Sequence, residues 1–323
     1  MSLLSVELSR IKDICLSEGF DLVGFTPAVI PKQDIDNIQS WVDQQFFGKM
    51  DWFTKQISQE IRLEMRHLGF VPQSVIALGM VYRSEEAEEI LEQSAVKVSR
   101  YALGDDYHQV LRNKGKNILK KLKQLYPQAS FRQSIDSLPI PEKVFARLAG
   151  IGWMGKNTNI INEAFGSYFF LSMILTDYKW EIPEVAKVDH CGTCNACLDA
   201  CPTGALFEPY KIDASKCISH HTIENREDDF SPTEFTANWL YGCDICQEVC
   251  PWNKNKAKRN RIQTTVKEFI PYKYWTENKN LMESPLSMED FASIFRNSAV
   301  KRIGSKSWNR NLSSVLNHLI QEE

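Results

Sequence analysis

Cysteine spacing constrains this chain more than any other feature of its sequence. Eight of the nine cysteines fall in the 60 residues from position 191 to position 250. The first four follow the pattern C-x2-C-x2-C-x3-C-P, and the last three follow C-x2-C-x3-C-P after an isolated cysteine at position 217. Thiolates at this spacing are typical ligands of [4Fe-4S] clusters. The sequence therefore predicts two clusters with eight ligands: Cys191, Cys194, Cys197, Cys201, Cys217, Cys243, Cys246 and Cys250.

The two runs are expected to exchange one ligand each. In two-cluster ferredoxins the fourth cysteine of each run ligates the other cluster. Carried over to this chain, the rule assigns Cys191, Cys194, Cys197 and Cys250 to one cluster, and Cys201, Cys217, Cys243 and Cys246 to the other. Structural zinc, which also takes four thiolates from C-x2-C pairs, is the alternative. Zinc does not account for two x3-Cys-Pro endings, so we favour iron-sulfur clusters.

Composition and charge indicate the cell compartment. Cysteines of a reducing compartment are better explained by metal than by disulfides. The first residues have no cationic stretch, no sustained apolar run and no twin arginine, so we expect no secretory signal and a cytoplasmic protein. The most apolar stretch, residues 165–175, is shorter than the roughly 20 residues of a membrane-spanning helix. The net charge is only −3, so no overall field points to nucleic acid or a membrane as a partner. We expect no membrane association, and we separately expect a monomer.

Outside the cysteine region, hydrophobic patterns of helices alternate with those of strands. The expected elements are helices at 4–18, 110–125, 288–295 and 312–320 and buried strands at 21–26 and 74–81. This alternation indicates an α+β fold with an N-terminal α/β domain. We divide the chain into a first domain (1–180), a cysteine-rich domain (181–260) and a C-terminal helical segment (261–323). Cys15 lies on the apolar face of the first helix and is predicted to be a buried thiol.

A glycine motif in the first domain matches the sequence pattern of a nucleotide-binding site. Gly150, Gly152 and Gly155 match the fingerprint G-x-G-x-x-G, which should follow a strand and open a helix. Residues 141–149 instead have helical apolar spacing with an early proline, so Gly150 is expected to close a helix. We therefore predict no nicotinamide site here.

Asp136 is a candidate acid, because it lies in an apolar segment stiffened by prolines, and such surroundings can keep a carboxyl protonated near neutral pH. The alternative role is that of a turn residue before a proline. Asp106-Tyr-His108 begins like the cobalamin-binding signature Asp-x-His-x-x-Gly, but Leu111 occupies the glycine position. We therefore do not expect His108 to ligate cobalt.

Two groups of basic residues are candidate nucleic-acid contacts, with solvated surface as the alternative. One lies on the predicted helix 110–125 and comprises Arg112, Lys114, Lys116, Lys120, Lys121 and Lys123. The other follows the last cysteine and comprises Lys254, Lys256, Lys258, Arg259 and Arg261.

Taken together, these motifs resemble those of the epoxyqueuosine reductases, the cobalamin-dependent enzymes that complete queuosine synthesis in tRNA. The resemblance covers most of the chain. It rests on the first cysteine run through residue 205 and on the segments 99–104, 106–108, 135–137, 149–157, 166–167, 208–210, 217–219, 222–224, 241–247, 250–253, 302–304 and 308–311.

The resemblance implies a cobalamin-binding first domain like that of reductive dehalogenases, followed by a ferredoxin-like domain with two [4Fe-4S] clusters. It implies reduction of the epoxide of epoxyqueuosine, at the wobble position of a tRNA anticodon stem-loop, to the alkene of queuosine. Asp136 becomes the expected proton donor, the cobalamin is expected in the base-off form, and an unidentified low-potential donor is expected to supply electrons. Expected cobalamin contacts are Arg62, Ser99, His108, Asp136, Lys156, Ser219 and Asp244, and expected tRNA contacts are Lys254, Lys256, Lys258, Arg259 and Arg261.

Three other functions compete with this one. Another cobalamin and iron-sulfur reductase of the dehalogenase kind would typically carry a twin-arginine signal, which is not found in this sequence. A ferredoxin-type electron carrier would leave about 180 N-terminal residues without a role. A zinc-stabilised RNA-binding module would contain zinc in place of iron.

Overall fold

The computed structural model describes residues 5–136, 138–186, 189–227, 237–254, 263–277 and 282–322. By internal packing the chain divides into two compact units. Unit 1 contains Met1–Gln45, Asp51–Val81 and His108–Cys194, and unit 2 contains Phe46–Met50, Tyr82–Tyr107 and Asn195–Glu323. The predicted boundaries at 180 and 260 do not coincide with this division.

Unit 1 is built on a four-stranded sheet with the order β1-β2-β7-β4. All three strand pairs are antiparallel, and Ala77 of β2 lies opposite Met173 of β7. Every residue of β2 is buried, as expected for the predicted strand 74–81. The strands are β1 (Leu22–Pro27), β2 (Ser74–Val81), β4 (Phe131–Ser134) and β7 (Phe169–Thr176).

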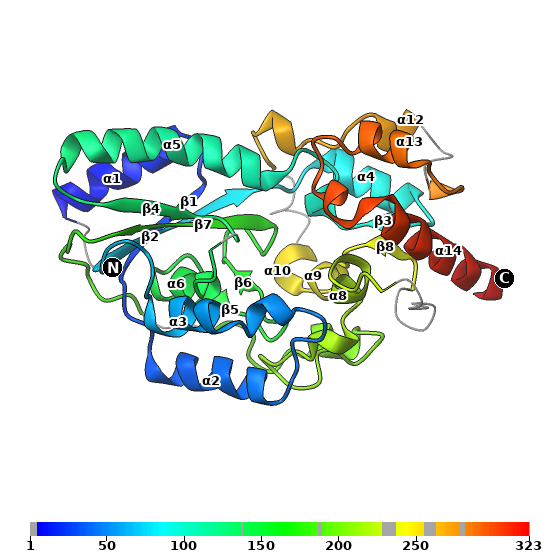
Figure 1. Cartoon of the computed structure of the whole chain (residues 1–323), viewed down its shortest axis with the longest axis horizontal. Coiled ribbons are helices and arrows are strands. Elements are labelled where there is room, and N and C mark those ends of the chain that lie inside the picture. Colours follow the sequence, from blue (N-terminus) through cyan, green and yellow to red (C-terminus); the bar gives the residue numbers. More distant parts are fainter. Residues whose placement is uncertain are drawn as a thin grey trace. The chain divides into compact units, whose positions relative to one another are not determined.

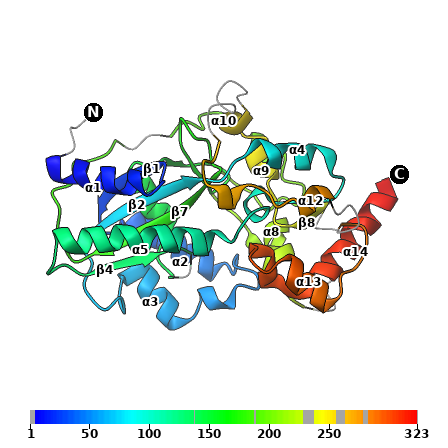
Figure 2. The ribbon, with the colours of Figure 1, turned by 90° about the horizontal axis from the view of Figure 1, so that it is seen from above.

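Helices cover both faces of this sheet (Figure 1). Helices α1 (Val6–Ser17) and α5 (Tyr107–Leu125) lie on one face, and α6 (Glu142–Leu148) lies on the other. In Figure 2, which views the molecule from above, α1 and α5 lie across the strands of the sheet. Gly24 of β1 permits the close approach of α6, because a Cβ there would lie 2.1 Å from the carbonyl oxygen of Ala149.

The first helix forms where the apolar spacing predicts it. The Ser5 side chain caps its N-terminus by accepting a hydrogen bond from the Leu8 N–H. Leu8, Ile11 and Cys15 are fully buried along one face. The zero exposure of Cys15 confirms the predicted buried thiol, and this burial raises its pKa to about 12.

The glycine motif is not a nucleotide-binding turn. Helix α6 ends at Leu148, and Gly150 follows it with a left-handed φ of 73°, as the sequence predicts for a closing glycine. The motif then leads into β5 (Trp153–Met154), which pairs with β6 (Ile160–Ile161), rather than into a helix.

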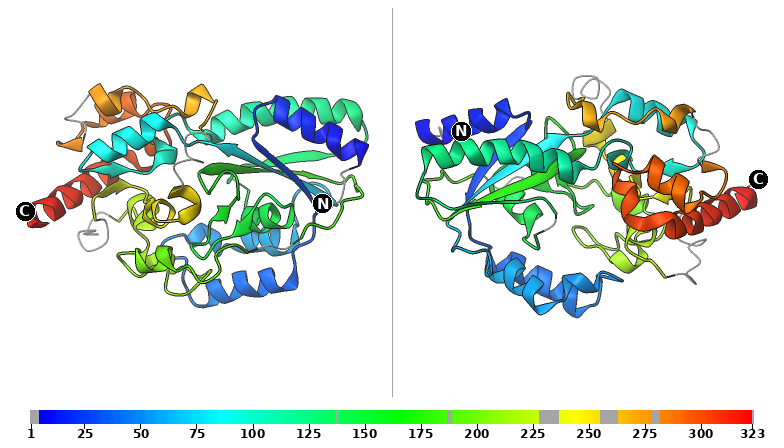
Figure 3. Two further views of the ribbon diagram at one scale, coloured as in Figure 1. Left: turned by 180° about the vertical axis from the view of Figure 1, so that it is seen from behind. Right: turned by 45° about the horizontal axis from the view of Figure 1, so that its top comes forward.

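Unit 2 has its own apolar core, which includes Trp275, Phe291, Phe295 and Trp308. Here α13 (Met288–Ile294) packs against α14 (Gly304–Glu322), and Figure 3 shows them side by side. In the same unit β3 (Lys97–Val98) pairs in parallel with β8 (Trp239–Tyr241), so residues 82–107 pack with the C-terminal part of the chain.

The remaining elements are short. They are α2 (Lys32–Asp43), α3 (Gln56–Glu64), α4 (Glu85–Gln93), α7 (Ala196–Asp199), α8 (Ile218–Ile223), α9 (Ile245–Glu248), α10 (Pro251–Lys254) and α12 (Tyr274–Glu277), with 3-10 turns at Asp51–Phe53, Arg100–Ala102, Ala214–Lys216, Lys267–Phe269 and Ala299–Ile303. Among the described helices, none combines the length and the apolar character needed to cross a membrane.

Candidate functional site

Cys246 interacts electrostatically with four other predicted cluster ligands of unit 2: Cys197, Cys201, Cys217 and Cys243. Burial raises the pKa of the Cys246 thiol far above its usual range, and negative charge on Cys217, Cys197 and Cys201 raises it further. Burial also raises the pKa of Cys243, where repulsion from Cys246 and Cys217 adds to the effect. Thiolates gathered in this way repel one another unless cations compensate their charge. The donor set therefore fits an iron-sulfur cluster held by thiolates.

The ligand set predicted for the first cluster, Cys191, Cys194, Cys197 and Cys250, has members in both units. Cys191 and Cys194 end unit 1, whereas Cys197 lies on α7 and Cys250 follows α9 in unit 2. The structure contains no disulfide at any of the nine cysteines. Within the described residues, no three His, Cys, Asp or Glu side chains gather as ligands of a single metal ion. The division of the ligands between two clusters stays a prediction.

Asp136 lies just beyond the end of β4 in unit 1. Its backbone has a left-handed φ of 53°, and its side chain is 54% exposed. His108, in the first turn of α5, places Nε2 3.7 Å from Asp136 Oδ2. An exposed carboxyl beside an imidazole can accept and release protons, because both groups exchange with water.

Glu142 supports this loop, although the sequence analysis did not identify it. Its Oε1 accepts hydrogen bonds from Ser134 Oγ at 2.7 Å and from the backbone N–H of Asp136 at 3.0 Å. Burial raises the pKa of Glu142 to about 7, and the negative charge of Asp136 contributes to the increase. The one signal in the sequence was an acidic residue directly after Pro141, where a helix begins.

Three of the predicted cobalamin contacts are Arg62, Lys156 and Ser219, and the first two form hydrogen bonds with nearby carbonyl oxygens. Arg62 is buried on α3, donates to the Phe53 carbonyl oxygen at 3.0 Å, and has its pKa lowered to about 10 by burial. Lys156 donates from Nζ to the carbonyl oxygen of Gly192 at 2.8 Å. Ser219 is half-buried on α8. These contacts do not test a cobalamin site, so the three assignments stay predictions.

Ser99 and Asp244 meet directly in unit 2. Ser99 Oγ donates to Asp244 Oδ1 at 2.5 Å, and the carboxylate also accepts from the backbone N–H of Arg100 at 2.9 Å. Asp244 is 1% exposed. The contact between Arg100 and Asp244 was not predicted from the sequence, because the two residues lie 144 positions apart.

The basic helix α5 uses some of its charge internally. Lys121 forms an ion pair with Glu18 at 2.6 Å, and Lys114 donates to the Glu18 carbonyl oxygen. Lys123 donates to the carbonyl oxygen of Ala129. Lys120 is exposed and forms no ion pair with the described residues.

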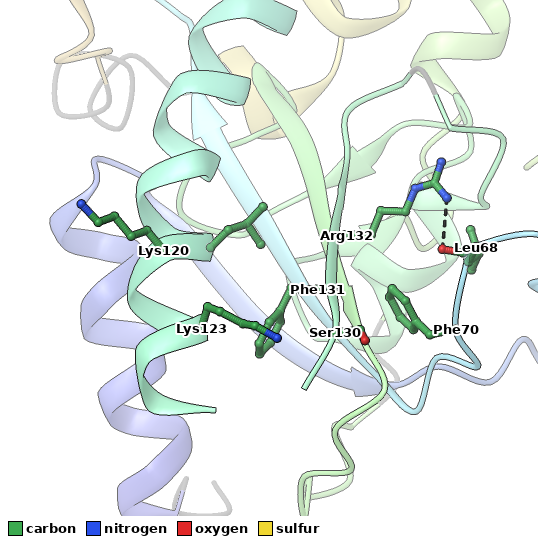
Figure 4. Close-up of a pocket in the computed structure, with 8 residues that line it drawn as sticks. Leu68, Phe70, Lys120, Lys123, Ser130, Phe131 and Arg132 are labelled. Carbon is green, nitrogen blue, oxygen red and sulfur yellow. Dashed lines mark hydrogen bonds between the residues drawn. The ribbon is translucent and has the colours of Figure 1, made fainter. Parts of the chain in front are cut away.

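A cavity of about 560 Å³ lies beside the C-terminal half of α5 and the start of β4. Figure 4 shows that Lys123 extends from α5 toward Phe131 and that Arg132 donates a hydrogen bond to the Leu68 carbonyl oxygen. The cavity is at the opposite end of β4 from Asp136. Its lining is Leu68, Phe70, Leu119, Lys120, Lys123, Ser130, Phe131 and Arg132.

The predicted basic segment after the last cysteine is only partly described. Lys254 is exposed at the end of α10. Lys256, Lys258, Arg259 and Arg261 lie outside the described residues.

Comparison with known proteins identifies two family models. Residues 62–137 match the model described as epoxyqueuosine reductase QueG, DUF1730. Residues 190–253 match the 4Fe-4S double cluster binding domain, and this range contains all eight predicted ligand cysteines.

Curated relatives and solved structures agree with these models. The chain is 36% identical over 313 residues to the epoxyqueuosine reductase of Leadbetterella byssophila, covering 95% of this chain and 97% of the relative. It is 35% identical to that of Escherichia coli, covering 97% and 82%. A crystal structure of epoxyqueuosine reductase with an epoxyqueuosine-modified tRNA-Tyr stem loop matches with a TM-score of 0.78 at 27% identity, covering 97% and 81%. Because the similarity to curated relatives extends over almost the whole chain, this protein belongs to the epoxyqueuosine reductase family.

Proposed function

We propose that this protein reduces epoxyqueuosine at the wobble position of tRNA to queuosine. The observation that carries the proposal is the similarity to curated epoxyqueuosine reductases over more than 90% of the chain. Removal of the epoxide oxygen consumes two electrons and two protons and yields an alkene and one water. The protein must therefore deliver electrons and protons to the same bound nucleoside.

We assign proton delivery to Asp136. Its exposed carboxyl can reach a bound substrate, and a protonated carboxyl can donate to the departing oxygen. His108, at 3.7 Å, can stabilise the carboxylate that remains. Glu142 holds residues 134–136 by accepting hydrogen bonds from the Ser134 hydroxyl and the Asp136 backbone N–H. A solved Bacillus subtilis relative, 29% identical with a TM-score of 0.79, is described with its catalytic loop swung out of the active site, which supports a mobile acid-bearing loop.

We assign electron delivery to two [4Fe-4S] clusters and a base-off cobalamin. When bound, cobalamin supplies a metal centre at which electrons arriving singly from the clusters are used together. His108 contacts Asp136 at 3.7 Å, so both side chains would line the same part of a bound cobalamin's pocket. The contacts expected for Arg62, Ser99, His108, Asp136, Lys156, Ser219 and Asp244 remain part of this proposal. A low-potential donor would reduce the clusters.

We assign tRNA binding to basic side chains at the surface. The exposed Lys254 and Lys120 provide cationic groups that can contact phosphates of an anticodon stem. In the sequence, Lys254 begins a basic group that continues with Lys256, Lys258, Arg259 and Arg261. A tRNA substrate also places the reaction in the cytoplasm, and we propose that the enzyme acts as a monomer.

Replacing Asp136 by Asn tests the proton-donor assignment. The amide has nearly the same shape but cannot donate a carboxyl proton, so Asp136→Asn should lose turnover by at least about 100-fold. Cluster and cobalamin absorbance should stay unchanged. Asp43→Asn, at an exposed residue of α2, is the matched control and should keep wild-type turnover. Wild-type turnover of Asp136→Asn would contradict the assignment.

Anaerobic metal analysis separates the competing functions. About eight iron and one cobalt per chain, after reconstitution with cobalamin, would support the reductase. Iron without retained cobalamin would favour the electron carrier. Zinc alone would favour the RNA-binding module and contradict the proposal.

A further inference from the structure

A buried arginine connects two segments of unit 2 that are far apart in the sequence. Arg100 Nη1 contacts Asp244 Oδ2 at 3.1 Å and Glu248 Oε1 at 2.7 Å. Its Nε and Nη2 donate to the two carboxylate oxygens of Glu88 at 3.1 and 2.9 Å. Because the guanidinium is a rigid fork, these contacts fix the relative positions of Glu88 on α4, and of Asp244 and Glu248 at the two ends of α9.

These contacts are shielded from water. The side chain of Arg100 is 6% exposed and that of Asp244 is 1% exposed. Arg83, also buried, makes a second ion pair with Glu88 at 3.1 Å. A charge in such surroundings is poorly screened, so the loss of one partner leaves an uncompensated buried charge whose field extends to its neighbours.

The closest chemically important neighbours are cluster ligands. Asp244 lies in the sequence between Cys243 and Cys246, and Arg100 approaches it from outside that loop. Asp244 directly follows Cys243 and precedes Cys246 by two residues, so the guanidinium that contacts its buried carboxylate lies next to a loop that carries two ligand sulfur atoms. The field of the Arg100–Asp244 pair is therefore felt at the sulfur atoms.

We propose that Arg100 is a positioning residue for the Cys243–Cys246 loop, and that the balance of its charge with Asp244 sets the reduction potential of the cluster bound there. The potential of an iron-sulfur cluster depends on the net charge and on the hydrogen bonds around it. Removing the cation next to a cluster makes addition of an electron less favourable, and removing the anion makes it more favourable. The inference rests on the cluster assignment in the proposed function.

Redox titration of the reconstituted full-length protein, followed by electron paramagnetic resonance, tests the inference without tRNA. Arg100→Gln should lower the equilibrium constant for one-electron reduction about tenfold, which is about 59 mV toward negative potential. Asp244→Asn should shift the potential in the opposite direction. The double variant, which removes both charges, should return close to the wild-type value. Arg302→Gln breaks a more exposed Arg–Glu pair of the same unit and is the matched control, expected to show no shift.

Each outcome separates this inference from the proposed function. Failure of the wild-type protein to bind iron would overturn the cluster assignment itself. Equal potentials in all variants, or shifts of the same sign in both single variants, would overturn the role of Arg100 and leave the reductase assignment standing. If Arg100→Gln fails to assemble a cluster, Glu248→Gln keeps the test open, since it removes a more accessible carboxylate and leaves Arg100 in place. An unchanged potential in Glu248→Gln would then count against charge control.

Discussion

The raised pKa of the Glu142 carboxyl leads to a quantitative prediction of how protein stability depends on pH. Its pKa rises from an ordinary value of 4.5 to about 7, chiefly because it is buried. The folded protein therefore holds this proton more tightly than the unfolded chain does, and the contribution of Glu142 to stability falls as pH increases from about 4.5 to 7. A shift of that size corresponds to about 3 kcal/mol above pH 7, at 1.36 kcal/mol per unit.

Replacing Glu142 by Gln removes the charge and keeps an oxygen that can accept from Ser134 Oγ and the Asp136 N–H. At pH 5 the variant should have nearly wild-type stability. At pH 8 it should be more stable by up to about 3 kcal/mol, less about 1 kcal/mol for amide hydrogens without partners.

Thermal unfolding of both proteins at pH 5, 6, 7 and 8 measures this difference. For a unit of this size, about 1 kcal/mol corresponds to roughly 2–4 °C in Tm. Glu289→Gln, at an exposed position of α13, should show no pH-dependent gain and serves as the control. The reasoning is refuted if Glu142→Gln changes Tm equally at all four pH values, or if it is less stable than the wild type at pH 8.

Three further predictions concern binding and packing. Lys120→Gln should weaken tRNA binding and reduce the slope of log affinity against log salt concentration by about 1. Lys121→Gln should have less effect, because Lys121 already forms an ion pair with Glu18. Equal slopes for both variants and the wild type would exclude a phosphate contact by Lys120. Trp308→Ala should lower the free energy of unfolding by about 3–5 kcal/mol, because the side chain is fully buried. Denaturant titration measures this loss, and a loss below about 1 kcal/mol would contradict the place of Trp308 in the core. Gly24→Ala should lower Tm, since the new Cβ would meet a backbone oxygen at 2.1 Å, and an unchanged Tm would show that α6 can move away freely.

Several elements could be predicted because their causes are local. The strand 74–81 and the first helix follow from hydrophobic periods of a few residues, and both occur where expected. The closing role of Gly150 follows from the need for a left-handed residue after a helix. The family also followed from short motifs, among them two cysteine runs whose spacing is set by cluster chemistry.

Other features depended on contacts that no local pattern contains. The segment 82–107 packs with the C-terminal part because β3 pairs with β8, a connection across about 140 residues. The support of Asp136 by Glu142 and the pairing of Arg100 with Asp244 were likewise absent from the prediction.

The sequence by itself determined the ligand chemistry and the local elements of this protein, since cysteine spacing and hydrophobic period act over a few residues. Only the tertiary structure decided which charges are buried together. A pKa or a reduction potential depends on burial and on nearby charges, and folding brings these together from distant parts of the chain. The strand order β1-β2-β7-β4 and the surroundings of Asp136 and Asp244 were therefore decided by the tertiary structure alone.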